Sequence, residues 1–312
     1  MKELRTLLPL AFLGLAGAGV VGVVAWVTAV HGPVPGARPS PGTEAEAAGP
    51  ADPVRLRPLR VNSVGELERA FERRNYQWPP GRTVPPLAVQ VFPHGLEGVG
   101  VSRKKRLFFR SLLPLVLAEN ARIGRERAFL RRAFAKGGLA PRDPLLAPVR
   151  AIAERYNVEG DLNDGAVRRR LLRRVDVVPP GLVLAQAANE SAWGTSRFAR
   201  EANNLFGHWT YDKDQGIVPR RRREGAEHFV RVFSGLRESV RAYLRNINAG
   251  HAYVGFRQMR SHLRASGQPL DPVVLAGGLE RYSERGWAYV AEIRTMIRNN
   301  RLGRLNGVRL AG

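Results

Sequence analysis

The chain has 312 residues, and its hydrophobic content of 44% is enough for one or two domains with a packed core. Its 50 basic and 27 acidic residues give a formal net charge of +23, which indicates attraction to a polyanion such as nucleic acid, anionic lipid or an acidic cell wall. The alternative explanation of that charge is a genome base composition that favours arginine codons. The absence of cysteine excludes disulfides and thiolate-based metal or redox chemistry.

The first segment of the chain predicts export. Lys2 and Arg5 precede a run from Leu7 to Val30 that contains no charged residue. The run is long enough to span a hydrocarbon core of about 30 Å, whereas the apolar part of a cleaved signal peptide has about 7–15 residues. Residues 1–31 are therefore interpreted as a signal anchor, with a cleaved signal peptide as the alternative. Either interpretation places the remainder in the cell envelope, where the wall is a more accessible polyanion than nucleic acid.

The next residues separate into a linker and a helical region. Residues 32–58 are rich in Pro, Gly and Ala and have no hydrophobic periodicity, which is typical of a flexible linker. Residues 59–150 have helical patterns, and Ser63 and Glu66 have the spacing of a capping box at a helix start. A long helical pattern farther along contains Pro114, which is expected to kink or divide the helix.

Residues 151–312 form the second predicted folded region, and they too are mostly helical. The strongest strand signal lies at residues 220–233. There His228, Val230 and Val232 alternate with Phe229, Arg231 and Phe233, and Glu224-Gly225 fits a tight turn. We therefore predict a mainly α-helical fold with one small inserted β-hairpin, preceded by the helical N-terminal region. The hairpin follows a helical segment that contains Glu190.

Glu190 is informative because it is the one acid in the apolar helical stretch LAQAANESAW. A carboxylate in such surroundings is costly unless it is paired, neutralised or used. One interpretation is a buried ion pair with one of the many arginines. The other is a carboxylic acid whose apolar surroundings raise its pKa, so that it donates a proton in glycoside cleavage. Trp193, Phe206 and Trp209 follow and offer faces for sugar rings, although each also suits a hydrophobic core.

The sequence around this acid resembles a known family. The stretch RVDVVPPGLVLAQAANESAWGTSRFAREANNLFGHW is similar to the glucosaminidase domain of peptidoglycan hydrolases in glycoside hydrolase family 73. The hallmark of that family is a helix ending in Glu-Ser-x-Trp-Gly, followed by a serine and then by Asn-Asn-Leu-Phe-Gly. The segments VPRRRREGAEH and YSERG resemble the Bax-like members more closely still, with Ser283-Glu284-Arg285 in place of the usual Ala-Thr-Asp.

The resemblance implies a lysozyme-like helical lobe with an inserted β-lobe. It implies that Glu190 is the general acid and that a second acid lies in the β-lobe, where Glu224 is our choice and Glu227 the alternative. Tyr282 matches a family tyrosine that faces the scissile sugar and could orient water or the N-acetyl group of the substrate, with a buried core tyrosine as the alternative. The remaining expected substrate contacts are Trp193, Asn204, Phe206, Trp209, Tyr289 and Arg223.

We therefore expect an endo-β-N-acetylglucosaminidase that cleaves the β-1,4 bond between N-acetylglucosamine and N-acetylmuramic acid in peptidoglycan glycan strands. It is expected to be a monomer on the periplasmic face of the inner membrane, or in the periplasm if the first segment is cleaved, with no cofactor, metal ion or nucleic-acid partner. A lytic transglycosylase or muramidase is the alternative enzyme, and a noncatalytic wall-binding scaffold is the alternative outside enzymes. Direct attack by water and substrate-assisted cleavage both stay open.

Overall fold

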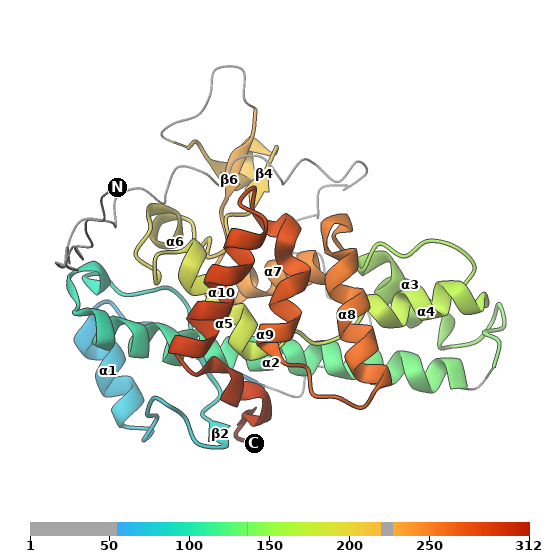
Figure 1. The fold of residues 1–312 in the computed structure, drawn as a ribbon, viewed down its shortest axis with the longest axis horizontal. Helices are drawn as coiled ribbons and strands as arrows, with labels where there is room; N and C mark the ends of the chain where they lie inside the picture. The colour runs from blue at the N-terminus through green and yellow to red at the C-terminus, as the bar shows by residue number, and fades with distance from the viewer. Residues whose placement is uncertain (1–54, 136, 220–226) are drawn as a thin grey trace, which may run out of the picture.

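The computed structural model describes residues 55–135, 137–219 and 227–312. The predicted signal anchor and most of the predicted linker lie outside the described residues. Within the described part of the chain, no helix is long and apolar enough to cross a membrane. The fold is mainly α-helical, as predicted. Figure 1 shows helices arranged around a long central helix, with a small sheet at one edge.

The elements of the described residues are short apart from that central helix. The α-helices are α1 (Val64–Glu72), α2 (Val101–Ala135), α3 (Leu146–Arg155), α4 (Gly165–Arg174), α5 (Pro180–Glu190), α6 (Arg197–Glu201), α7 (Leu236–Ala249), α8 (Val254–Ala265), α9 (Pro272–Leu275) and α10 (Trp287–Asn299). Two of the 3-10 helices are η5 (Ala276–Tyr282) and η6 (Leu302–Gly307). The strands are β1 (Arg57–Leu59), β2 (Thr83–Val84), β3 (Leu87–Val89), β4 (Trp209–Thr210), β5 (Gly216–Ile217), β6 (Phe229–Arg231) and β7 (Arg309–Leu310).

Helix α5 lies inside the helical body. A proline occupies its first turn, where the missing N–H removes no helical hydrogen bond. Every residue from Pro180 to Ala188 is buried, and the helix contacts α2, α10 and η6. Gly181 permits the contact with η6, because a Cβ there would lie 2.5 Å from the carbonyl oxygen of Leu302. A helix that is buried on all sides has little contact with water, so a charge on one of its side chains is poorly solvated.

Helix α2 settles one of the two outcomes expected at Pro114, the division of the helix. Pro114 neither divides nor ends it, and the helix continues to Ala135. Every residue from Ser111 to Asn120 is buried around that proline. Packing on all sides of this stretch therefore outweighs the single backbone hydrogen bond that the proline removes.

The N-terminal region has two parallel strand pairs, and one of them joins it to the last residues of the chain. β1 pairs in parallel with β3, and β2 pairs in parallel with β7 near the C-terminus. Arg57 and Pro58, the last two residues of the predicted linker, belong to β1. The predicted boundary after residue 150 falls within α3, and one hydrophobic cluster includes residues on both sides of it, from Val61 to Leu305.

The inserted β-lobe contains a three-stranded antiparallel sheet in which β6 lies between β4 and β5. The alternating pattern predicted a hairpin over residues 220–233, whereas β6 covers residues 229–231 and its partners precede it in the chain. The predicted turn at Glu224-Gly225 lies outside the described residues. β4 and β5 escaped prediction because a strand of two residues is too short for alternation to identify it.

Buried ion pairs join the helices around α5. Glu119 of α2 is fully buried, and its carboxylate accepts hydrogen bonds from Arg122 of α2 and from Arg237 and Arg241 of α7, at 3.1, 2.6 and 3.0 Å. Burial by itself would raise the pKa of Glu119, but the three guanidinium groups outweigh it and lower that pKa from 4.5 to about 2. Glu119 is therefore ionised at neutral pH and binds α2 to α7.

Two other buried carboxylates follow the same rule. Glu126 of α2 accepts hydrogen bonds from Arg122 at 2.7 Å and from the hydroxyl of Tyr156 at 2.9 Å. Asp176, between α4 and α5, accepts one from Arg264 of α8 at 2.9 Å. The contacts of Tyr156 with Glu126 and of Arg264 with Asp176 link segments that are distant in the sequence, so they fix how the helices are placed relative to one another.

Loss of the Glu119 carboxylate should destabilise the fold strongly. In Glu119→Gln three guanidinium groups face a neutral side chain, and breaking a buried ion pair from one side costs about 3–5 kcal/mol. Urea unfolding at neutral pH measures this loss. Because the folded-state pKa is lowered, the contribution of Glu119 is present above about pH 4.5 and is lost as the pH falls toward 2.

The matched control is Glu68→Gln. The ion pair of Glu68 with Arg103 lies at the surface, where the arginine side chain is half exposed, and such pairs contribute about 0–1 kcal/mol. Equal losses of stability in the two variants would contradict the role assigned to Glu119.

Candidate active site

Glu190 is the last residue of α5 and is followed directly by a strained turn. The hydroxyl of Ser191 donates back to the last turn of α5 at 2.5 Å and accepts the backbone N–H of Gly194 at 2.9 Å. Ala192, Trp193 and Gly194 have φ angles of 49°, 60° and 80°. This left-handed conformation costs a residue with a Cβ about 1–2 kcal/mol, and such strain concentrates at functional sites.

The carboxyl group of Glu190 has a raised pKa. It is raised from 4.5 to about 7, because burial raises it by more than hydrogen bonds from Tyr289 and Asn189 and the charge of Arg285 lower it. The residue still keeps some exposure to solvent. No described residue forms an ion pair with Glu190, so within the described part of the chain the ion-pair interpretation is wrong. At neutral pH about half of the molecules carry a proton on Glu190, which suits a general acid.

A chain of hydrogen bonds leads to this carboxyl group. The hydroxyl of Tyr243 in α7 donates to the side-chain oxygen of Gln186 in α5. The amide nitrogen of Gln186 then donates to the hydroxyl of Tyr289 in α10 at 2.9 Å. Because the Tyr289 oxygen accepts that bond, its own proton is directed to Glu190. Three helices therefore cooperate to present one hydrogen-bond donor to the acid.

Buried tyrosines surround Glu190. Burial has the largest effect on the hydroxyls of Tyr243, Tyr253, Tyr282 and Tyr289 and raises the pKa of each. The negative charge of Glu190 raises these pKa values further. The rings of Tyr282 and Tyr289 are stacked, with centroids 5.4 Å apart and planes 7° from parallel. All four hydroxyls therefore remain neutral and offer hydrogen bonds without adding a charge.

Several residues predicted to contact the substrate form hydrogen bonds within the protein instead. The buried amide of Asn204 donates to the carbonyl oxygens of His208 and Arg231 at 2.8 and 2.9 Å and accepts the backbone N–H of His208 at 2.9 Å. The ring of Phe206 is buried, and the Tyr282 hydroxyl donates to its carbonyl oxygen at 3.1 Å. These bonds attach the segment after α6 to β6 and to η5, so the substrate roles predicted for Asn204, Phe206 and Tyr282 stay predictions.

The other predicted residues lie in different surroundings. Trp193 is half-buried against the aromatic rings of α2, whereas Trp209 is a half-buried residue of β4 in the β-lobe. Glu227 is exposed just before β6. Glu224 and Arg223 lie outside the described residues. In the described part of the chain, no group of His, Asp and Glu side chains could hold a metal ion.

Sequence reasoning missed part of the site. Tyr243 and Tyr253 follow the ordinary apolar pattern of core helices, and nothing local to them indicates an acid nearby. Two exposed aromatic residues also went unnoticed, Tyr211 after β4 and Trp287 at the start of α10, which are 55% and 58% exposed. Their signal is visible only once burial is known, since exposed rings do not serve the core.

Comparison with known proteins identifies the family. A family model described as mannosyl-glycoprotein endo-beta-N-acetylglucosaminidase matches residues 167–302, which include α5, the sheet and α10. Protein bax of Escherichia coli (strain K12) is 34% identical over 198 residues, covering 63% of this chain and 70% of that protein. The chain belongs to the Bax-like glucosaminidase-domain family. No solved structure gives a significant match.

The raised pKa of Glu190 predicts a pH-dependent difference in stability. Glu190 ionises near pH 7 when folded and near 4.5 when unfolded, so its contribution is full below about pH 4.5 and is lost as the pH rises through 7. Glu190→Gln does not ionise and should gain about 1–3 kcal/mol over the native chain between about pH 4.5 and 8. Urea unfolding at several pH values measures the difference. Glu201→Gln, at a surface ion pair, is the control, and an equal trend there would refute the raised pKa.

Tyr289→Phe removes the hydroxyl that donates to Glu190 and keeps the ring. That hydrogen bond favours the ionised carboxylate, so its loss should raise the pKa of Glu190 by about one further pH unit. A carbon-13 NMR titration of the carboxyl group measures the change. Tyr253→Phe is the control, because the hydroxyl of Tyr253 bonds to Asn246 and not to Glu190. The same pKa change in both variants would argue against the hydrogen-bond chain.

Proposed function

We propose that this protein is an endo-β-N-acetylglucosaminidase that cleaves the β-1,4 bond between N-acetylglucosamine and N-acetylmuramic acid in peptidoglycan. One observation carries the proposal. Glu190 is a carboxyl group with a pKa of about 7 and no ion-pair partner among the described residues, and it lies in the segment that matches a glucosaminidase family model. The family supports glycosidase chemistry, and the particular bond is our inference from the motif around Glu190.

Glu190 acts as the general acid in this proposal. Its protonated carboxyl group donates to the glycosidic oxygen as the bond to the anomeric carbon breaks, which avoids the expulsion of an alkoxide. The carboxylate that remains accepts the hydrogen bond of Tyr289. The neutral hydroxyl stabilises that carboxylate but does not keep Glu190 ionised at all times. The arginines around Glu119, by contrast, keep that carboxylate ionised.

The second half of the reaction needs a nucleophile at the anomeric carbon. Either a second carboxylate activates a water molecule, or the acetamido group of the substrate attacks. Glu224 remains our choice for the second carboxylate, and Glu227 remains the alternative. The role of Tyr282, whose ring stacks on that of Tyr289, is in this proposal to orient the water or the acetamido group.

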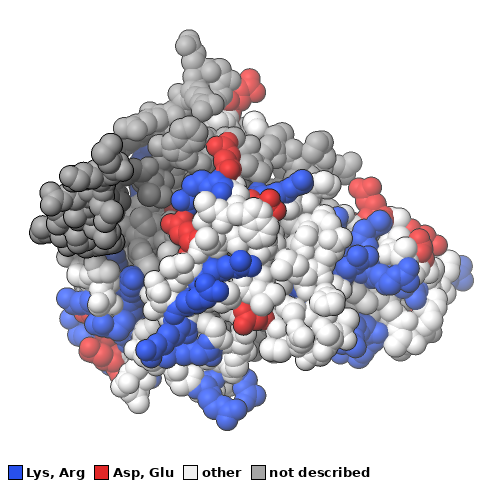
Figure 2. All heavy atoms as spheres, viewed as in Figure 1, with Lys and Arg blue, Asp and Glu red and all other residues white. Residues whose placement is uncertain are grey.

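The surface of the protein suits an acidic wall. Lys and Arg side chains are spread over the face drawn in Figure 2, with Asp and Glu side chains among them, and the full sequence has a net charge of +23. Attraction of this kind raises the local concentration of a polyanionic substrate. The exposed rings of Tyr211 and Trp287 are available to stack on sugars. We propose the periplasmic side of the cell envelope as the location, reached through the apolar segment at residues 7–30.

Digestion of purified wall tests the reaction. The native chain should release fragments that end in reducing N-acetylglucosamine, identified by borohydride reduction and mass spectrometry. Glu190→Gln should lower the rate by about 10²–10⁴-fold, because it keeps the shape of the acid and removes its proton. Anhydromuramic or free muramic ends would instead identify a transglycosylase or muramidase. Binding without any cleavage would identify a wall-binding scaffold.

Variants of the two β-lobe acids test the second carboxylate. Glu224→Gln should reduce turnover on isolated glycan strands at least about tenfold, the low end of what a general base contributes, with little change in binding. Glu227→Gln should have a smaller effect. The reverse order would assign the role to Glu227. Full activity of both variants would favour attack by the acetamido group of the substrate.

A further inference from the structure

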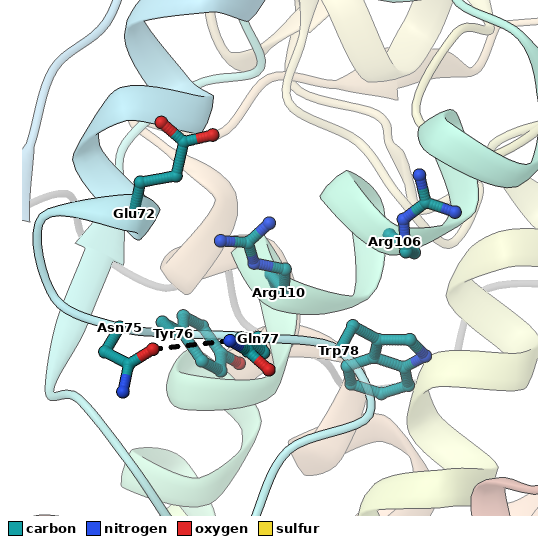
Figure 3. A pocket seen from close by; sticks show the side chains of 7 residues that line it. All are labelled: Glu72, Asn75, Tyr76, Gln77, Trp78, Arg106 and Arg110. Carbon is teal, nitrogen blue, oxygen red and sulfur yellow. Dashed lines mark hydrogen bonds between the residues drawn. The ribbon is translucent and has the colours of Figure 1, made fainter.

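A pocket lies beside the end of α1, outside the residues that match the family model. It encloses about 370 Å³, within the range of about 300–1,000 Å³ that is usual for ligand sites. Figure 3 shows the lining side chains, which come from α1, from the loop after it and from α2. The residues that the following argument uses are Glu72, Tyr76, Trp78, Arg106 and Arg110.

The pocket contains polar groups that the fold leaves without partners. Tyr76 is 3% exposed, and its hydroxyl has no hydrogen-bond partner among the described residues. Arg110 is half-buried over the ring of Phe71, 4.3 Å from its centre, and its Nε atom has no hydrogen-bond partner in the described part of the chain. Unsatisfied polar groups in buried places are costly and rare, so these two point to a ligand that completes them.

The chemistry of these groups selects the ligand. Arg106 and Arg110 are one turn apart on α2, and both side chains line the pocket. Guanidinium forks and a hydroxyl donor are suited to a carboxylate. Trp78 is held by stacking on Phe109 at 4.8 Å and offers an apolar face beside them. The carboxylate of Glu72 at the rim suits an ammonium group, so the set matches a short peptide with both kinds of charge.

Packed aromatic rings connect this pocket to the turn after Glu190. Trp78 stacks on Phe109, and Phe109 meets Trp193 edge to face at 5.3 Å. Trp193 belongs to the strained turn that ends α5. Two ring contacts, both through Phe109, therefore separate the pocket from the turn that follows Glu190.

We propose that the pocket of Tyr76, Trp78, Arg106 and Arg110 binds the stem peptide of peptidoglycan through a peptide carboxylate. This inference rests on the proposed function, because it assumes that the wall is the substrate. It makes the N-terminal region a determinant of specificity, which directs cleavage to strands that carry peptides.

Binding of a synthetic wall tetrapeptide with a free carboxylate tests the site directly. Calorimetry is done with the full chain in detergent. Arg110→Lys keeps the charge and loses the planar fork, and Arg106→Gln removes the other guanidinium from an exposed position. Each variant should weaken binding at least about tenfold, as expected for the loss of one charge-assisted hydrogen bond. Arg132→Gln, exposed in the last turn of α2, is the matched control and should bind like the native chain.

Thermal unfolding checks that the variants are folded, and two outcomes overturn the site. One is equal peptide binding by all four chains. The other is inorganic phosphate that binds as tightly as the peptide and displaces it, which would identify a general anion site.

Cleavage separates this inference from the proposed function. On wall that carries peptides, Arg106→Gln and Arg110→Lys should raise KM at least about fivefold with kcat unchanged, a loss of the kind expected for uniform binding. On glycan strands stripped of peptides by an amidase, both should match the native chain, and an equal loss there overturns the inference. Glu190→Gln should bind the tetrapeptide normally. Cleavage without peptide binding refutes the pocket alone, whereas peptide binding without glucosaminidase products refutes the function and leaves a peptide site.

Discussion

The arrangement of the helices around α5 depends on one constraint, that a charge removed from water must have a partner. Glu119 and Glu126 of α2 and Asp176 before α5 are buried carboxylates that arginines or a tyrosine from other segments satisfy. These contacts lie where α2 meets α7 and where α8 meets the start of α5. A shift of any of these helices would separate a buried charge from its partner. The apolar core sets how much surface is buried, and the ion pairs select one arrangement of it.

Glu190 meets the same constraint by a different route. Its partners are a tyrosine and an asparagine, and the glutamine and tyrosine behind them, so the cost of burial appears as a raised pKa. An ion pair stabilises only the ionised form, whereas a hydroxyl can serve a carboxyl group before and after it gives up its proton. The strained turn after α5 and this unpaired acid both lower the stability of the chain. Backbone strain and an unpaired buried acid that occur together are typical of a functional site.

Local features were predictable from the sequence because their partners are neighbours in the chain. Ser63 caps α1 by accepting the Glu66 N–H at 3.3 Å, although the Glu66 carboxylate accepts the N–H of Asn62 and not that of Ser63. The lone acid of the apolar helix, Glu190, has the raised pKa that its surroundings predicted. The environment of Glu190 was only partly predictable. The resemblance supplied Tyr289, but Tyr243 and Tyr253 reach the acid through packing between distant segments, which periodicity does not reveal. The same limit applies to Asn204, since its buried amide bonds to β6 can be recognised only in three dimensions.

The pairing of β2 with β7 has a consequence for the order of folding. It joins residues 83–84 to residues 309–310, so most of the chain forms the loop that this contact closes. Loops of that length close slowly, because the entropy of closure is lost before the contact gives anything in return. β1 and β3, by contrast, meet across a short segment and can pair early. β2 can therefore pair with β7 only after residues 309–310 have come back to the N-terminal region.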